Sequence, residues 1–241
     1  MRTCVNFAHR GASGVCPENT MAAFVKAIEL GATGIETDVQ MTRDGRLVLI
    51  HDETLQRTAG VSGWVKDFTL DELRQLDAGA WYGEEFRGEK IPVLEELLEL
   101  AKRHDLVLNL ELKNGHVSYP GMEERTAEIV RRFRMCGQVI ISSFNHYSLV
   151  LMKQAAPEIE TAVLYMEGLY EPWVYARRIG ASALHPYRLA VTPAWVQEAG
   201  KWGIRYHPFT VNEESEMRTM LDAGVSGIIT DYPDRLAALL A

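Results

Sequence analysis

Residues 30–38, with the sequence LGATGIETD, show the pattern that decides the fold: the end of a helical segment, a glycine, small residues, and a short apolar strand that ends in polar groups. A glycine directly after a helix can adopt the left-handed conformation that ends the helix. Short apolar strands of this kind are typical of a buried parallel sheet. The pattern recurs at residues 179–186 (IGASALHP), 202–210 (WGIRYHPFT) and 223–231 (AGVSGIITD).

The spacing of these repeats indicates the kind of fold. The glycines at positions 180, 203 and 224 are too close for half of a dinucleotide-binding fold, but they fit single β/α units of a barrel. Helices are expected between the strands, because apolar residues recur with helical periodicity, as in residues 94–101. Eight strands alternating with helices predict an α/β fold, a (β/α)8 TIM barrel that occupies residues 1–241 as a single domain. The strands are expected near residues 4–9, 34–39, 106–112, 139–143, 161–165, 182–185, 204–208 and 226–230.

Residues 53–90 break this alternation. They follow an apolar strand at 47–51, are rich in glycine and aromatic residues, and have no long helical periodicity. Long connections of this kind are more often functional than idle. We therefore expect a small inserted subdomain after the second strand, over the mouth of the barrel. The alternative is an ordered surface elaboration that takes no part in the chemistry.

The composition excludes several classes of protein. There are 25 Lys and Arg against 33 Asp and Glu, and the net charge of −8 argues against nucleic acid or an anionic membrane as a partner. Cys4, Cys16 and Cys136 have no CxxC spacing, so neither a disulfide framework nor a thiolate zinc site is indicated. No apolar stretch resembles a signal peptide or the ~18 residues of a membrane span, so we expect a cytoplasmic protein without membrane insertion. Nothing in the sequence indicates a homo-oligomer.

Three carboxylates are expected to converge inside the barrel. Glu36 and Asp38 are two residues apart on one strand and share a face, and Glu111 faces inward from the strand at 106–112. Like charges this close are costly unless a cation lies between them. Carboxylates without cysteine ligands suit a hard divalent cation, so the sequence predicts Mg²⁺ or Ca²⁺ here, with Mn²⁺ as a further candidate.

Two histidines and two cations are expected beside this metal site. His9 and His51 each end a predicted strand. Arg10 directly follows His9, and Lys113 lies two residues after Glu111. This combination is typical of a phosphate-ester site, in which cations hold the phosphoryl oxygens while one imidazole takes a proton and the other gives one. The residues leave open which histidine is the acid and which is the base.

An ordered series of motifs runs along the chain from about residue 5 to residue 236. The motifs are HRGA (9–12), PENT (17–20), AF (23–24), GIETDV (34–39), DG (44–45), HD (51–52), IP (91–92), LELK (110–113), SFN (143–145) and FTVN (209–212). In these motifs the chain resembles the glycerophosphodiester phosphodiesterases. This resemblance implies a TIM barrel with an insertion after the second strand. It also implies hydrolysis of glycerophosphodiesters, such as glycerophosphocholine and glycerophosphoethanolamine, to glycerol 3-phosphate and an alcohol with a divalent metal.

The resemblance also assigns roles to single residues. It implies that Glu36, Asp38 and Glu111 are metal ligands, that His9 and His51 are the acid/base pair, and that Arg10 and Lys113 hold phosphate. Glu18 lies in a signature segment and is expected to support the site. Phe209 stands where the family commonly has Trp, and it is expected to offer an aromatic surface to the substrate.

Three further residues are candidates from their positions alone. His185 ends a predicted strand and is therefore a candidate for substrate contact. Thr210 and Asn212 could line the site, although Asn212 equally suits the N-cap of the helix that follows it.

Two other functions are consistent with such a barrel. One is a phospholipase D of the sphingomyelinase type, but those proteins are usually secreted and disulfide-bonded. The other is an inactive barrel that serves as a binding module, which would be expected to have lost a catalytic histidine or carboxylate. The sequence chooses neither the preferred head group nor the nucleophile, which is either water or the 2-hydroxyl of glycerol.

Overall fold

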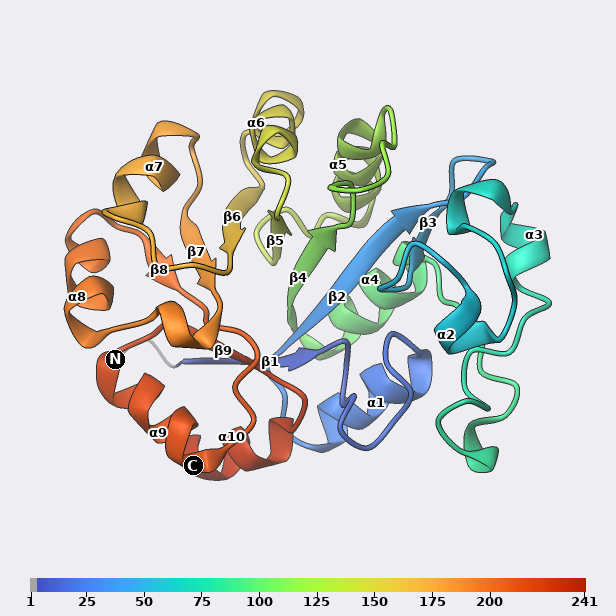
Figure 1. The fold of residues 1–241 in the computed structure, drawn as a ribbon, viewed down its shortest axis with the longest axis horizontal. Helices are drawn as coiled ribbons and strands as arrows, with labels where there is room; N and C mark the ends of the chain where they lie inside the picture. The colour runs from blue at the N-terminus through green and yellow to red at the C-terminus, as the bar shows by residue number, and fades with distance from the viewer. Residues whose placement is uncertain (1–3) are drawn as a thin grey trace.

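The computed structural model describes residues 4–241 and contains a barrel of parallel strands surrounded by helices (Figure 1). Neighbouring strands follow the order β8-β7-β6-β5-β4-β2-β1-β9. Backbone hydrogen bonds close the gap between β8 and β9, from Ser226 N to Tyr206 O and from Ile229 N to Pro208 O, both 3.0 Å. The prediction of a (β/α)8 barrel is confirmed. The strands are β1 (Val5–His9), β2 (Gly34–Met41), β4 (Val107–Leu112), β5 (Val139–Ser143), β6 (Glu160–Tyr165), β7 (Ala183–Pro186), β8 (Arg205–Tyr206) and β9 (Gly227–Thr230).

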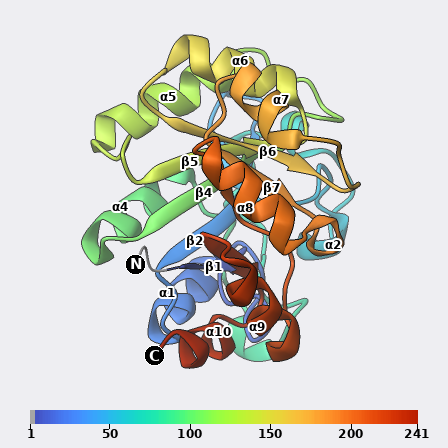
Figure 2. The same cartoon turned by 90° about the vertical axis from the view of Figure 1, so that its left-hand side faces the viewer.

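The helices form the outer ring of the barrel, and Figure 2 shows α8 crossing in front of the strands from one side. Each helix buries an apolar face against the strands, as α4 does with the four residues predicted from its periodicity, from Leu94 to Ala101. Gly31 and Gly224 follow the ends of α1 and α9 with φ angles of 81° and 83°, as the repeated pattern predicts. The helices are α1 (Met21–Glu29), α4 (Leu94–His104), α5 (Met122–Phe133), α6 (His146–Ala155), α7 (Pro172–Arg178), α8 (Pro193–Lys201), α9 (Glu214–Ala223) and α10 (Pro233–Leu240).

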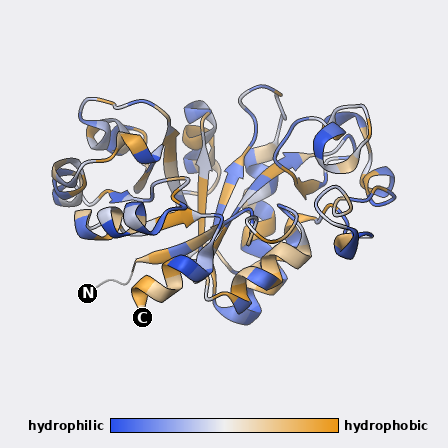
Figure 3. Ribbon diagram, turned by 60° about the horizontal axis from the view of Figure 1, so that its bottom comes forward, coloured by the Kyte–Doolittle hydropathy of each residue, from blue (hydrophilic) through white to orange (hydrophobic). Residues whose placement is uncertain are grey.

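Apolar residues fill both the barrel interior and the space between strands and helices. Phe7 lies at the centre of the interior, where a Cβ atom on Gly34 or Gly227 would come within 2.8 Å of its ring. The two glycines therefore leave the room that this large side chain needs. Figure 3 shows hydrophobic residues concentrated along the central strands, while the loops at the strand ends are more hydrophilic. The barrel thus has an interior packed with side chains rather than an open channel.

The inserted segment has a small apolar core of its own. It begins after β3 (Leu47–Leu49), which pairs antiparallel with β2, and it contains α2 (Gln56–Ala59) and α3 (Leu70–Leu73) with two short 3-10 turns, Val65–Asp67 and Glu84–Phe86. Its core joins residues of β3 to the start of α4 and consists of Val48, Ile50, Leu55, Val65, Leu73, Ala78, Ile91 and Val93. In Figure 1 the segment lies beside β3, on the opposite side of the barrel from α7 and α8.

Candidate active site

Three carboxylates converge at the C-terminal ends of two neighbouring strands. Glu36 and Asp38 lie two residues apart on β2, so their side chains point to the same face. In the pairing of β2 with β4, Asp38 is the register partner of Glu111. One carboxylate oxygen of each residue lies within 4.8 Å of the others, and all three side chains are buried or nearly so. The structure therefore brings the three predicted ligands together.

The electrostatics of this cluster favour a bound cation. Burial, followed by the nearby charge of Asp38, raises the pKa of Glu36, and burial also raises the pKa of Glu111. Burial would raise the pKa of Asp38 as well, but Arg10 and Lys113 outweigh it and lower that pKa. The positive charges of Arg10 and Lys113 thus stabilise the ionised form of Asp38, but they do not fully offset the burial of Glu36 and Glu111. A donor set made only of carboxylate oxygens fits a hard divalent cation.

His9 is held by a carboxylate from the last strand of the barrel. Its Nδ1 lies 2.6 Å from Asp231 Oδ1, and its Nε2 lies 3.9 Å from Glu36 Oε2. Asp231 also accepts hydrogen bonds from Ser13 Oγ at 2.9 Å and from Asn212 Nδ2 at 2.7 Å. Burial would lower the pKa of His9, but the hydrogen bond to Asp231 and the charge of Glu36 raise it. His9 is thus set up to carry a proton.

His51 has a different environment, which keeps it neutral. Its Nδ1 lies 2.8 Å from Asp52 Oδ1, and its Nε2 lies 3.2 Å from Lys113 Nζ. A lysine ammonium can only donate, so this contact favours an accepting Nε2, and Asp52 favours the ring proton on Nδ1. Burial lowers the pKa of His51, and the charges of Arg10 and Lys113 add to this against the opposite effect of Asp38. The imidazole therefore presents an unprotonated Nε2 to the site.

The two predicted cations contact the carboxylate cluster directly. Arg10 donates from its backbone N to Glu36 Oε2 at 3.1 Å, and its Nε lies 3.3 Å from Asp38 Oδ2. Lys113 Nζ lies 3.0 Å from Glu111 Oε1 and 3.8 Å from Asp38 Oδ1. These contacts place an ammonium and a guanidinium at the edge of the cluster, where an anionic substrate would approach. Glu18 supports Arg10 by accepting from its Nη1 at 3.0 Å.

The predicted aromatic residue lies at the mouth of the barrel. The ring of Phe209 is half-buried, with centroids 6.1 Å from Phe144 and 6.2 Å from Tyr187 in edge-on arrangements. A groove of about 250 Å³ lies on the Phe144 side and includes Glu111 and Lys113. Another groove, of about 450 Å³, lies on the Tyr187 side and is lined by Phe209. Phe209 therefore lies between these two grooves at the mouth of the barrel.

The structure corrects the expectation for His185. Its side chain has no exposed surface, and its ring contacts His207 at 2.9 Å and the amide of Asn109 at 3.5 Å. The residue lies level with Leu164 of β6, below the end of the strand. A substrate at the mouth cannot contact a ring buried at this depth, so the structure does not include His185 in the site.

Three residues of this site were not identified from the sequence. Asp52 and Asp231 hold the two histidines, and Arg57 in the insertion contacts Asp52. Asp231 directly follows the strand at 226–230, so the rule that selects His9 and His51 also applies to it. Asn212 contacts the site through Asp231, and Glu213 instead occupies the N-cap of α9. No pattern in the sequence marks Arg57, because the insertion lacks regular periodicity.

Known proteins resemble this chain over almost its whole length. Residues 9–235 match the model of the Glycerophosphoryl diester phosphodiesterase family. The chain belongs to this family. The prediction of an enzyme of this class is confirmed. A glycerophosphodiester phosphodiesterase of Caldanaerobacter subterraneus subsp. tengcongensis is 50% identical over 240 residues, covering 100% of this chain and 98% of the relative. One of Bacillus altitudinis is 47% identical over 234 residues, covering 95% of each protein.

A solved structure extends the likeness to the fold. An Oleispira antarctica phosphodiesterase, in complex with the product sn-glycerol-3-phosphate, has a TM-score of 0.86 and 32% sequence identity. The match covers 96% of this chain and 94% of that one. That phosphodiesterase therefore binds a glycerol phosphate as its product. No helix among residues 4–241 is long and apolar enough to cross a membrane.

Proposed function

We propose that this protein hydrolyses glycerophosphodiesters, such as glycerophosphocholine and glycerophosphoethanolamine, to glycerol 3-phosphate and an alcohol, with the help of a divalent cation. The observation that carries the proposal is the meeting of three carboxylates, two imidazoles and two cations at the ends of β1, β2 and β4. Membership of the family and the product complex of the Oleispira antarctica relative support it.

Glu36, Asp38 and Glu111 are the residues that would hold the cation, which we propose to be Mg²⁺ or Ca²⁺, with Mn²⁺ as a further candidate. When bound, the cation supplies positive charge that stabilises the charge developing on the phosphoryl group. Arg10 and Lys113 would bind phosphoryl oxygens and orient the diester. Both side chains contact the carboxylates that would hold the cation, which supports this role.

The two histidines divide the proton transfers between them. His51 is the base, because its Nε2 is an acceptor aimed into the site with the ring proton held on Nδ1 by Asp52. His9 is the acid, because Asp231 holds its Nδ1 and leaves Nε2 to donate toward the departing alcohol. The nucleophile that loses its proton to His51 is water or the 2-hydroxyl of glycerol. Attack by the 2-hydroxyl expels the alcohol and forms a cyclic phosphate, which a water molecule then opens to glycerol 3-phosphate. Phe209 and Phe144 offer apolar faces to the two arms of the diester.

A coupled assay of glycerol 3-phosphate release tests the proposal. Glycerophosphocholine and glycerophosphoethanolamine are each supplied with Mg²⁺, Ca²⁺ or Mn²⁺, and with EDTA. We expect turnover with at least one cation, none with EDTA, and a loss of at least about 10³-fold in Asp38→Asn, since a metal contributes several kcal/mol. Glu84→Gln, an exposed carboxylate of the insertion, is the control and should retain full activity.

Two results would contradict this function. Cleavage of lysophosphatidylcholine without cleavage of glycerophosphocholine would indicate a phospholipase D instead. Calorimetric binding of a diester without turnover, with all three cations, would indicate a binding module.

A further inference from the structure

Arg57, on α2 of the insertion, joins two carboxylates that belong to different sides of the site. Its Nε donates to Asp52 Oδ2 at 2.7 Å, and its Nη2 donates to Asp52 Oδ1 at 2.9 Å. The same guanidinium donates from Nη1 to Glu18 Oε2 at 2.8 Å and from Nη2 to Glu18 Oε1 at 2.7 Å. Both carboxylates are therefore held by two hydrogen bonds each.

Each of these carboxylates contacts a residue that we place in the chemistry. Asp52 Oδ1 accepts from Nδ1 of His51 at 2.8 Å, and Glu18 Oε1 accepts from Nη1 of Arg10 at 3.0 Å. Arg57 itself touches neither the imidazole nor the carboxylate cluster. Its influence on the site therefore passes through Asp52 to the base and through Glu18 to the phosphate-binding guanidinium.

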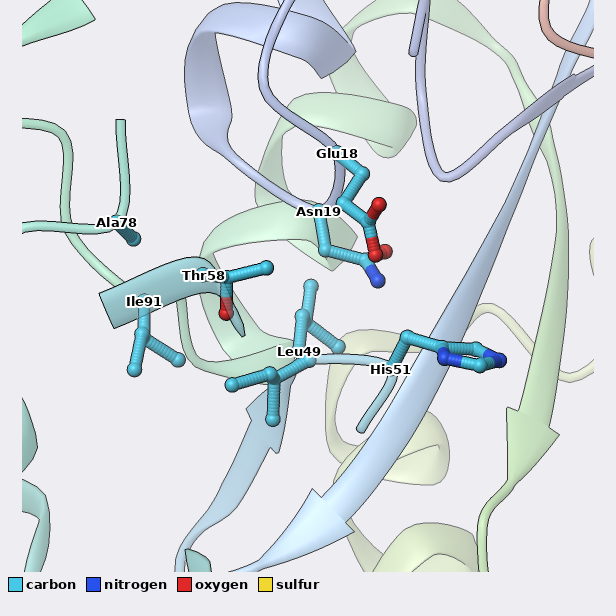
Figure 4. A pocket seen from close by; sticks show the side chains of 8 residues that line it. Glu18, Asn19, Leu49, His51, Thr58, Ala78 and Ile91 are labelled. Carbon is cyan, nitrogen blue, oxygen red and sulfur yellow. The ribbon is translucent and has the colours of Figure 1, made fainter. Parts of the chain in front are cut away.

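The surroundings hold Arg57 in this position from the side of the insertion. The ring of Trp81 lies 5.8 Å from its guanidinium carbon, and the neighbouring Thr58 is buried against a cavity of about 10 Å³. Figure 4 shows Glu18 and His51 on one side of this cavity, Ala78 and Ile91 on the other, and Thr58 between them. The end of α2 thus packs where the insertion meets the catalytic end of the barrel.

A guanidinium is required for this geometry. Its planar fork presents fixed donors that match two carboxylates at once, whereas a lysine ammonium is a compact charge without that fork. The side chain of Arg57 is 41% exposed, and ion pairs this exposed usually contribute little to folding stability. The four directed bonds therefore matter mainly for where Asp52 and Glu18 point.

We propose that Arg57 is a positioning residue that couples the insertion to catalysis, an inference that rests on the function proposed above. By fixing Asp52, it keeps the proton of His51 on Nδ1 and leaves Nε2 unprotonated, so that Nε2 can accept the proton of the nucleophile. By fixing Glu18, it keeps the guanidinium of Arg10 beside Asp38, where the phosphoryl group is bound. The insertion thereby takes part in the chemistry through one side chain.

The first test needs no turnover and uses the metal-free protein. The ¹⁵N signals of the His51 ring, assigned with His51→Gln, report which nitrogen carries the proton. We expect the Nδ1-protonated form in the wild type and a mixture of both tautomers in Arg57→Ala. Arg87→Ala is the matched control, because Arg87 also lies in the insertion but pairs with Glu84 away from the site. An unchanged tautomer in Arg57→Ala would overturn the proposal, whatever the substrate of the enzyme proves to be.

The second test uses kinetics on glycerophosphocholine to separate the contact of Arg57 with Asp52 from its contact with Glu18. Outer residues that orient active-site groups typically contribute 10–100-fold, so we expect a fall in kcat of about that size and a rise in KM in Arg57→Ala. Asp52→Asn should reproduce the loss of kcat, and Glu18→Gln the rise in KM. Adding Arg57→Ala to the combined Asp52→Asn and Glu18→Gln variant should then change little. Full additivity would show that Arg57 acts elsewhere and would overturn the proposal.

A third variant guards against a simple folding defect. Arg57→Lys keeps the positive charge and is expected to keep the melting temperature within a few degrees of the wild type. Its kcat should nevertheless fall nearly as far as that of Arg57→Ala, since the fork is lost. Wild-type kinetics in Arg57→Lys would show that charge alone suffices and would reject the positioning role.

Discussion

The two halves of the barrel contribute unequally to the site. The first half, from β1 to β4, carries the three carboxylates, both histidines that we propose to be catalytic and both cations. The second half, from β5 to β9, also places polar residues inside the barrel, but His185 and His207 are bonded to each other below the strand ends. From this half, Asp231 contacts His9, and Phe144 and Phe209 line the mouth. We therefore propose that the first half supplies the reacting groups, while the second half orients His9 and offers apolar surface to the substrate.

Among the changes that test this division of roles, replacing either histidine of the first half should lower kcat the most. General acid–base groups contribute about 10²–10⁴-fold each, so His9→Ala and His51→Ala should each lower kcat on glycerophosphocholine by about that factor. Melting temperatures measured by circular dichroism should show that the fold is retained. His104→Ala, an exposed histidine at the end of α4, is the control and should keep wild-type turnover. Near-wild-type turnover in either catalytic variant would remove that histidine from the mechanism.

A smaller loss is expected from a change at Asp231, the residue of the second half that contacts His9. Asp231→Asn removes the negative charge beside Nδ1 of His9 and places an amide where Asn212 also donates. We expect kcat to fall about 10–100-fold, less than in His9→Ala. The imidazole remains, but its orientation is less fixed and its protonated form is less stabilised. Initial rates at saturating glycerophosphocholine measure this loss.

The control for this change is Asp234→Asn, an exposed carboxylate three positions along the chain that should have no effect. A loss in Asp231→Asn as large as that in His9→Ala would make the second half an equal partner in catalysis. Unchanged kcat would instead leave the second half with no part in the chemistry.

The sequence predicts most of the first half because its information is local. Glu36 and Asp38 share a face by the two-residue period of a strand, and the same period turns Glu111 inward on the next parallel strand. The repeated glycine patterns likewise predict strands and helices one unit at a time. Such features need no knowledge of which distant segments meet, so both the fold and the carboxylate cluster could be inferred from the residues.

The remaining residues depend on contacts that only the closed barrel creates. Asp231 meets His9 because β9 pairs with β1, the first and last strands of the chain. Arg57 meets Glu18 because the insertion folds back on the loop after β1, which no periodicity reveals. The burial of His185 has a related cause: the sequence shows that the residue lies near a strand end, but not that its ring is buried against His207 and Asn109. How deep a side chain lies along the barrel axis depends on how the closed barrel packs, and the sequence pattern does not show it.

The smallest effect on catalysis, and a distinct effect on stability, is expected from the buried pair of the second half. Burial lowers the pKa of His185 to about 3, and burial with the neighbouring His185 lowers the pKa of His207. Above the ordinary histidine pKa of about 6.5, both folded and unfolded chains are neutral at these positions. As the pH falls below 6.5, the unfolded chain binds protons that the folded chain refuses, so stability falls, by up to roughly 1.4 kcal/mol per pH unit for each histidine.

His207→Gln should therefore reduce the pH dependence of unfolding without reducing turnover at neutral pH. Urea denaturation between pH 5 and pH 7 measures the slope of the unfolding free energy, and this slope should decrease relative to the wild type even if the variant is less stable throughout. His104→Gln, which replaces an exposed histidine at the end of α4, is the matched control. His9 shifts in the opposite direction but is present in all three proteins, so its contribution cancels. If His207→Gln kept the wild-type slope while losing turnover, the buried pair would belong to the chemistry, and the division between the two halves would fail.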